Sequence, residues 1–267
     1  MSIILVEGES KSMKTSVGQQ ILEALDELGK RVIRADAGSF FRKVTVCVWD
    51  QLDAEAITSP TAEDFSRAAL KVLDSKAPYD LTRDWGDSLH SARVDHTVGT
   101  VSQTALVQEA SKKWWLETPS QALESDTDVL VLDGRNPRAR LQPWLDANHM
   151  APTLELFCVC DPVIAAERTL KGRGIEEPTE DEKAHEQAAI EKRRYEDRHR
   201  DTLAFIDPPV YESFEPGMDP VKAIQESRDK GGVAGPLPVR IDTGTMTRDV
   251  QRDVVVSLVR AALSTTA

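Results

Sequence analysis

The first apolar run of the chain covers residues 3–6 and leads directly into Gly8. Beyond Lys14 and Thr15, apolar side chains recur at positions 17, 21, 25 and 28, which is the spacing of one face of an α-helix. Gly29 follows the last of them and ends the predicted helix. The pattern therefore predicts a strand, a tight loop and an amphipathic helix, and the rest of the chain is arranged around this unit.

Four later apolar runs predict further strands, at residues 31–35, 128–132, 154–160 and 237–241. The run at 128–132 reads DVLVL, which is typical of a central parallel strand buried on both sides. Helices are predicted at 39–49, 62–73, 98–116, from Pro162 to Gly172 or Gly174, at 179–205 and at 248–263, with a second short helix starting at Thr118-Pro119. This alternation predicts an α/β fold with a five-stranded parallel sheet covered on both faces.

Two regions interrupt the alternation. Residues 51–93 combine one helix with a turn-rich stretch, and we interpret them as an inserted lobe. Residues 208–238 are rich in proline, glycine and charge, and they predict a long surface excursion. The predicted organisation is a core made of residues 1–50 and 94–267, with one insertion.

The 267-residue chain carries a formal net charge of -12, which argues against general nucleic-acid binding because phosphate neutralisation needs a basic surface. Its three cysteines form no CxxC spacing, which suits a reducing compartment, and Cys158 and Cys160 are expected to pack as small apolar residues. No signal peptide opens the chain, and no apolar run approaches the ~20 residues needed to span a bilayer. We expect a cytoplasmic protein with neither a membrane nor a nucleic-acid partner; the oligomeric state stays open.

The loop after the first strand fits the phosphate-binding pattern G-x-x-x-x-G-K-[ST] at Gly8, Lys14 and Thr15. Backbone N–H groups in such a loop point at one spot, where they and the helix dipole favour an anion. Lys14 would add charge against the phosphates, and the hydroxyl of Thr15 would reach Mg²⁺. Lys11 and Met13 stand where glycine would let the backbone approach freely. The alternative is an ordinary strand-to-helix turn with a solvated lysine.

Charged residues follow the buried strand at 128–132 and recur in the helix predicted at 179–205. Asp133 and Arg135 lie at the carboxyl end of that strand, where open α/β sheets bind their ligands. Arg193, Asp197 and Arg200 are spaced i, i+4 and i+7, which places all three on one side of a helix. This side is either part of a binding site or an exposed, ion-paired face.

Four separated segments resemble the cytidylate kinase family of nucleoside monophosphate kinases, in the same order along the chain. They read GESKSMKTS, ADAGSFFRKVTV, LDGRNP and IEKRRYEDRHR, starting at residues 8, 35, 132 and 190. VSQTALVQ from residue 101 and VRIDTGTMTRDVQRDVV near the C-terminus are also similar to family segments. The resemblance covers roughly half of the chain; residues 51–93 and 208–238 match poorly.

The resemblance implies transfer of the γ-phosphoryl group of ATP to the 5′-phosphate of a pyrimidine nucleoside monophosphate, with Mg²⁺. It also implies a three-layer fold of the P-loop NTPase type, a helical lid at about residues 172–200, and residues 51–93 as the lobe that binds the monophosphate. Such a transfer depends mainly on positioning and on neutralisation of the phosphoryl oxygens.

The same resemblance implies the residues of the site. Those on the ATP side are Gly8, Ser10, Ser12, Met13, Lys14, Thr15, Ser16 and Arg168, with Thr15 also on the metal. Those on the acceptor side are Asp36, Gly38, Phe41, Arg42, Ser102, Asp133, Arg135, Asn136, Arg193, Asp197 and Arg200. The catalytic charges would be Lys14, Arg135, Arg193 and Arg200.

Several positions depart from the family pattern. Phe41 replaces a tyrosine, Ala37 a serine or threonine, and Arg194 the aspartate after the lid arginine. Ser111 and Asn136 stand where the family has the arginine and aspartate that help read cytosine. Two alternatives stay open: a catalytically impaired relative that binds nucleotide as a sensor or scaffold, suggested by Lys11 and Met13, and a P-loop kinase of another small molecule.

The adjacent tryptophans Trp114 and Trp115 allow two interpretations. They are expected to pack, one in the core and one under the inserted lobe, rather than to form a platform for a base.

Asn136 generates a prediction about base selectivity. A carboxylate only accepts a hydrogen bond, as from the cytosine amino group, whereas an asparagine amide also donates to a carbonyl. We therefore expect the purified protein to accept UMP, dCMP or dTMP at rates comparable with CMP in a phosphorylation assay. A strong preference for CMP would contradict the assignment made from Asn136.

Overall fold

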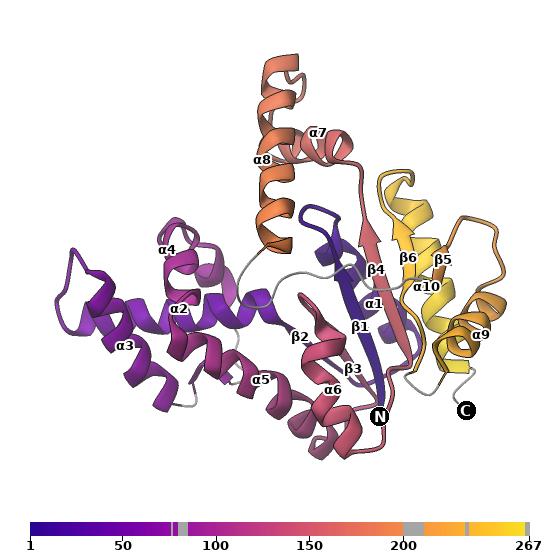
Figure 1. Ribbon diagram of the computed structural model, residues 1–267, viewed down its shortest axis with the longest axis horizontal. Helices are drawn as coiled ribbons and strands as arrows, with labels where there is room; N and C mark the ends of the chain where they lie inside the picture. Colours follow the sequence, from indigo (N-terminus) through magenta and orange to yellow (C-terminus); the bar gives the residue numbers. More distant parts are fainter. Residues whose placement is uncertain (76, 80–84, 200–210, 233–234, 265–267) are drawn as a thin grey trace.

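The computed structural model describes residues 1–75, 77–79, 85–199, 211–232 and 235–264 of the chain. Within these ranges one six-stranded parallel sheet forms, in the order β2-β3-β1-β4-β6-β5 (Figure 1). The strands are β1 Ser2–Gly8, β2 Val32–Asp36, β3 Val129–Asp133, β4 Leu154–Val159, β5 Tyr211–Ser213 and β6 Val239–Asp242. The five predicted strands are thus confirmed as parallel neighbours, and the short β5 extends the sheet at one edge.

The α-helices of the described residues are α1 Lys14–Glu27, α2 Ala37–Ala54, α3 Ala62–Asp74, α4 Ala92–Ser102, α5 Ala105–Glu124, α6 Pro137–Ala147, α7 Pro162–Gly172, α8 Glu180–Arg198, α9 Pro220–Gly231 and α10 Arg248–Ser264. Helices α1, α9 and α10 cover one face of the sheet, and α5 and α6 cover the other. Two short 3-10 helices, Ala77–Tyr79 and Gly86–His90, lie between α3 and α4. The arrangement is a three-layer α/β fold.

Successive side chains of the central strands point to opposite faces of the sheet, and both faces are apolar, which explains the two helical layers. In β1, Ile3 and Leu5 join the core formed with α2, α5 and α6, whereas Ile4 and Val6 join the core formed with α1, α9 and α10. β3 divides in the same way, and every residue of β3 is buried. Strands apolar on both faces are the expected result of burial between two layers.

Helix α5 corrects one prediction. It continues from residue 105 to residue 124 with Pro119 inside it, so the separate helix predicted to start at Thr118-Pro119 is wrong. Proline interrupts the backbone hydrogen bonding of a helix. Here the same turn is buried, and Nε1 of Trp144 in α6 donates to Oγ of Ser120 at 2.8 Å. Packing of the turn offsets the missing hydrogen bond.

The region 208–238 contains a strand and a helix that the sequence analysis did not predict. In α9, the Asp219 side chain accepts from the N–H groups of Val221 and Lys222 at 2.9 and 3.3 Å, and Pro220 takes the first turn. Ala223 and Ile224 are buried in the core shared with α10. Capping and an apolar face were therefore present in the sequence, but the high proline and charge content masked them. Helix α6 was missed for a similar reason, since it begins at a proline and contains a second one.

Figure 1 shows where the predicted lobe and the predicted lid lie. Helix α2 runs unbroken across residue 50, and α2, α3 and α4 gather at the side of the molecule away from β4 and β6. Helix α8 stands over the carboxyl ends of the strands, beside α7. Residues 200–205 of the predicted helix lie outside the described residues. The division into a core and a monophosphate-binding lobe stays a prediction.

The tandem tryptophans and the cysteines are buried. Trp114 and Trp115 both join the core on the α2 and α5 side, with ring centroids 5.2 Å apart and nearly perpendicular planes. Cys158 and Cys160 are buried in separate apolar clusters. Among the described helices, none combines the length and apolar character required to cross a bilayer.

The central strand generates a stability prediction. Leu130 of β3 is fully buried, so Leu130→Ala is expected to lower the free energy of unfolding by about 2–5 kcal/mol. Leu123 of α5 is 47% exposed, and Leu123→Ala is expected to change it by less than about 0.5 kcal/mol. Urea unfolding of both variants measures the difference, and equal effects would contradict the described core.

Candidate functional site

The loop between β1 and α1 has an unusual backbone. Gly8 has φ 152°, and a Cβ on it would lie 2.2 Å from the carbonyl oxygen of Cys158 in β4, so glycine is required there. Lys11 and Met13 have φ 62° and 58°, in the left-handed region that L-residues rarely adopt. Each costs roughly 1 kcal/mol. These are the two positions at which the sequence lacks an expected glycine, so the loop keeps a glycine-like shape without glycine.

Lys14 lies at the centre of this loop. Its Nζ donates to the carbonyl oxygens of Gly8 at 2.9 Å and of Glu9 at 2.7 Å. Burial, then the charge of Arg135, lowers the pKa of Lys14. Ser10 and Ser12 are buried in the loop, and Ser12 Oγ donates to the Glu9 carbonyl at 2.9 Å.

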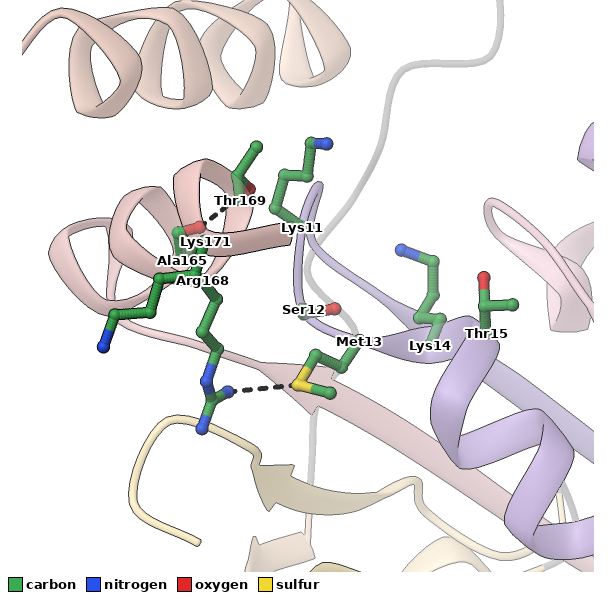
Figure 2. A pocket seen from close by; sticks show the side chains of 9 residues that line it. All are labelled: Lys11, Ser12, Met13, Lys14, Thr15, Ala165, Arg168, Thr169 and Lys171. Carbon is green, nitrogen blue, oxygen red and sulfur yellow. Dashed lines mark hydrogen bonds between the residues drawn. The ribbon is translucent and has the colours of Figure 1, made fainter. Parts of the chain in front are cut away.

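A first cavity of about 580 Å³ opens between the loop and α7 (Figure 2). It is lined by Lys11, Ser12, Met13, Lys14, Thr15, Ala165, Arg168, Thr169 and Lys171. The guanidinium of Arg168 donates to the carbonyl oxygens of Thr243 and Met246 at 2.7 and 3.3 Å, and it lies 3.2 Å from Sδ of Met13. Predicted residues of the ATP side from the loop and from α7 therefore share one cavity.

A second cavity of about 470 Å³ lies at the carboxyl end of β2 and the start of α2. It is lined by Thr15, Arg34, Ala35, Asp36, Gly38, Ser39, Phe40, Arg42, Lys43, Leu89 and Trp114. Thr15, an exposed residue of the first turn of α1, lines both cavities. The two spaces therefore meet at the end of the loop.

The cations of the second cavity have carbonyl and carboxylate partners. Arg42 donates to the carbonyl oxygen of Leu89 at 2.8 Å and pairs with Asp95. Arg34 Nη2 lies 3.3 Å from Oδ2 of Asp133. The sequence analysis assigned Arg42 but not Arg34 or Lys43. For Arg34 only its place two residues before Asp36 in a strand could have suggested a role.

Asp36, Gly38 and Phe41 take different places around this cavity. The Asp36 carboxylate caps α2, accepting from the N–H groups of Gly38 and Ser39 at 2.8 and 3.2 Å. Phe41 does not line the cavity; its ring packs edge-on against Phe40 at a centroid distance of 5.7 Å.

Buried carboxyl groups lie in three strands of the sheet: Asp133 and Glu7 near the carboxyl ends of β3 and β1, and Glu155 near the start of β4. Burial, then the charge of Asp36, raises the pKa of Asp133 to about 6, against the opposing charges of Lys14 and Arg34. Burial also raises the pKa of Glu7 to about 7, although the N–H of Asn136 donates to Glu7 Oε1 at 2.5 Å. Glu155 of β4 pairs with Arg138, and burial raises its pKa to about 7. Burial thus favours the protonated form of all three carboxyl groups.

Helix α8 brings some predicted residues together and leaves others apart. Asp197 is buried, and its Oδ2 lies 2.6 Å from Nη2 of Arg135, which follows β3. Arg193, one turn earlier, is exposed. Ser102, at the end of α4, donates to the carbonyl oxygen of Gly99 at 3.0 Å and does not line the second cavity. Arg200 lies outside the described residues.

Two arginines of α8 that the sequence analysis did not assign reach the loop. Nη1 of Arg194 lies 2.9 Å from Oε2 of Glu9, and Nη2 of Arg198 lies 3.0 Å from Oε1 of the same side chain. Arg194 had been noted as a departure from the family pattern. No local sequence signal links it to Glu9, because the two residues are far apart in the chain.

Magnesium would find few protein ligands here. In the described part of the chain, no three His, Cys, Asp or Glu side chains cluster so as to hold a metal ion. Mg²⁺ is commonly held by substrate phosphates, waters and one or two protein oxygens. The hydroxyl of Thr15, where the cavities meet, and the buried carboxylate of Asp133 fit that requirement.

No protein-family model and no curated protein matches this chain. What the site can do therefore follows from its geometry. It offers a strand-to-helix loop with a half-buried lysine, two adjoining cavities and arginines from several elements. This set suits two phosphorylated ligands held side by side.

Glu7 generates a pH prediction. Its pKa rises from 4.5 to about 7 on folding, so the folded state keeps a proton that the unfolded state has lost, and stability falls as the pH rises through this window. Glu7→Gln removes that term and is expected to raise the free energy of unfolding at pH 8 by on the order of 2 kcal/mol, with little change at pH 5.

Urea unfolding at several pH values measures this difference. The exposed Glu124→Gln is the matched control and is expected to follow the wild-type profile. A Glu7→Gln profile parallel to the wild type would contradict the buried, protonated carboxyl group.

Proposed function

We propose that this protein is an ATP-dependent nucleoside monophosphate kinase of the P-loop NTPase type that transfers the γ-phosphoryl group to a pyrimidine monophosphate. The observation that carries the proposal is the meeting of two cavities at Thr15, beside the half-buried lysine of the loop. One cavity would hold ATP and the other the acceptor. Location in the cytoplasm is part of the same proposal.

The first cavity suits the ATP side. The N-terminus of α1 and the loop N–H groups favour a polyphosphate, and Lys11 and Lys14 supply positive charge. Lys14 Nζ, now held by two carbonyl oxygens, would turn to the β- and γ-phosphates. Arg168, already fixed by the Thr243 carbonyl, would lie along the nucleotide.

The second cavity suits an acceptor phosphate. Arg34, Arg42 and Lys43 place three cations around it, and guanidinium groups bind phosphate oxygens in pairs. Trp114 offers an apolar wall to the same space. A phosphate here would compete with Asp95 for Arg42 and with Asp133 for Arg34.

The transfer itself would use charges from separate elements. The bond from the γ-phosphorus to the β,γ-bridging oxygen breaks, and a bond to an acceptor phosphate oxygen forms, so charge spreads over the equatorial oxygens. Lys14, Arg135, Arg193 and Arg200 would neutralise it, and Asp197 would hold the ribose. Thr15 would hold Mg²⁺ with support from Asp133, and the ion would supply positive charge to the phosphate oxygens.

Two observations support a pyrimidine acceptor without a cytosine requirement. Ser111, at the position of the family's base-reading arginine, is fully buried in α5 and lines neither of the two cavities described above. Asn136 starts α6 in a left-handed conformation, with its N–H committed to Glu7. Neither residue supplies a fixed carboxylate or guanidinium to the base.

A nucleotide sensor without catalytic activity is the second candidate. It is favoured by the left-handed Lys11 and Met13 and by the attachment of Lys14 to loop carbonyl groups. Such a loop could bind ATP while holding its lysine away from the transferring group. A kinase of a different small phosphorylated molecule is the third alternative.

Coupled ADP release, measured across a panel of nucleoside monophosphates, tests the proposal. Lys14→Ala is expected to lower kcat by about 10²- to 10³-fold, since it removes charge stabilisation of the transferring group. Lys112→Ala, on the exposed surface of α5, is the matched control and is expected to keep wild-type activity.

The other outcomes separate the alternatives. Saturable ATP binding with no ADP release from any monophosphate would favour the sensor. Activity that appears only with other phosphorylated small molecules would favour the third alternative. Equal activity of Lys14→Ala and the wild type would overturn the kinase proposal.

A further inference from the structure

The phosphate loop contains an acidic residue that should oppose its own ligand. Glu9 directly follows Gly8, and its side chain is only 16% exposed. A carboxylate beside a site for nucleotide phosphates repels them, more so where water is excluded. The structure pairs both Glu9 oxygens with arginines of α8, at 2.9 Å to Arg194 and 3.0 Å to Arg198. The repulsion is therefore neutralised from outside the loop.

Arg194 also holds the backbone of the loop. Its Nε and Nη2 donate to the carbonyl oxygen of Ser10 at 3.2 and 3.0 Å, and Nη2 donates to the carbonyl oxygen of Cys160 at 3.0 Å. The residue is 7% exposed. One buried guanidinium thus joins α8 to the loop and to the end of β4. The rigid fork of arginine donors makes such a set of contacts without further ordering.

The loop needs an external support because its own sequence does not favour its shape. Lys11 and Met13 hold left-handed conformations that glycine adopts without strain. Strained backbone persists only where surrounding contacts over-determine it. The contacts of Arg194 with Glu9 and Ser10 flank this segment on its N-terminal side.

We propose that Arg194 is a positioning residue that holds the phosphate loop in its anion-binding conformation, taking over the part played elsewhere by loop glycines. Only the nature of the anion rests on the proposed kinase function. Three residues further on, Asp197 pairs with Arg135 at the end of β3. Helix α8 therefore ties the loop to the acceptor side, so ordering of the loop and placement of the lid helix are coupled.

Hydrogen exchange in the protein without ligand tests the support itself. Arg194→Met is expected to speed exchange of the amides between Glu9 and Met13 by about tenfold or more, because several charge-assisted hydrogen bonds are lost. The double variant Arg194→Met with Glu9→Gln also removes the charge of Glu9, which keeps its pair with Arg198 in the single variant, and is expected to show the same loosening. Lys192→Met, an exposed change on the same helix, is the control and is expected to leave loop exchange unchanged.

Kinetics and rescue test the positioning role. Arg194→Met is expected to raise the KM for ATP by about tenfold or more with a smaller change in kcat, and Arg194→Lys to retain part of the ATP affinity. Adding Met13→Gly to Arg194→Met is expected to restore much of the ATP affinity, because glycine removes the strain that Arg194 supports. A residue needed only for folding would show no such rescue.

The two proposals fail in different ways. Unchanged loop exchange in Arg194→Met, or no rescue by Met13→Gly, would overturn the positioning role and leave the kinase proposal standing. Faster loop exchange in a protein that binds no ATP would support the positioning role and overturn the kinase function. Titration calorimetry with a non-hydrolysable ATP analogue distinguishes these results.

Discussion

The site depends on how closely β1 approaches β4 where the loop begins. Gly8 is the register partner of Cys158, and a side chain on Gly8 would overlap the Cys158 carbonyl oxygen. β1 also lies at the centre of the sheet, between β3 and β4. The loop therefore starts from a strand that has no freedom to shift. Its position relative to the end of β3 and the start of α7 is set by backbone packing, before any functional side chain contributes.

Acidic and basic side chains lie close together around the loop and the ends of β1 and β3. Buried carboxylates of β1 and β3, Glu7 and Asp133, lie under the loop, and burial raises the pKa of both. The charge of Lys14 opposes this rise at both groups, together with Arg135 at Glu7 and Arg34 at Asp133. Lys14 is also held by the carbonyl oxygens of Gly8 and Glu9, and Arg34 by Asp133, so a bound anion would have to displace these partners. Within a chain of net charge -12, Arg34 and Arg135 thus pair with the carboxylates of Asp133 and Asp197 near the strand ends.

Helix α8 contacts both the loop and the residues after β3. Its mean composition is strongly polar, and its buried residues are largely charged ones that contact the loop and the end of β3. Ile190 packs with Cys160, Ala165 and Ala166 in a small apolar cluster against α7. Ion pairs at Glu9 and Arg135 add the contacts with the loop and the end of β3, so a change in the loop would also act on the helix.

The sequence by itself determined the five main strands, the turn from Gly8 to Thr15 and the charged helix, because apolar periodicity and glycine placement act locally. The tertiary structure decided the rest. Pro119 lies inside a helix because the turn around it is buried, β5 forms because β6 offers a free edge, and Arg194 reaches Glu9 across 185 positions. Arg34 lines the second cavity because the assembled sheet brings β2 beside β3, and its local sequence does not indicate this place. Contacts between residues far apart in the chain produce no periodic sequence pattern. Which residues are buried and which charges pair is therefore decided only when the layers assemble.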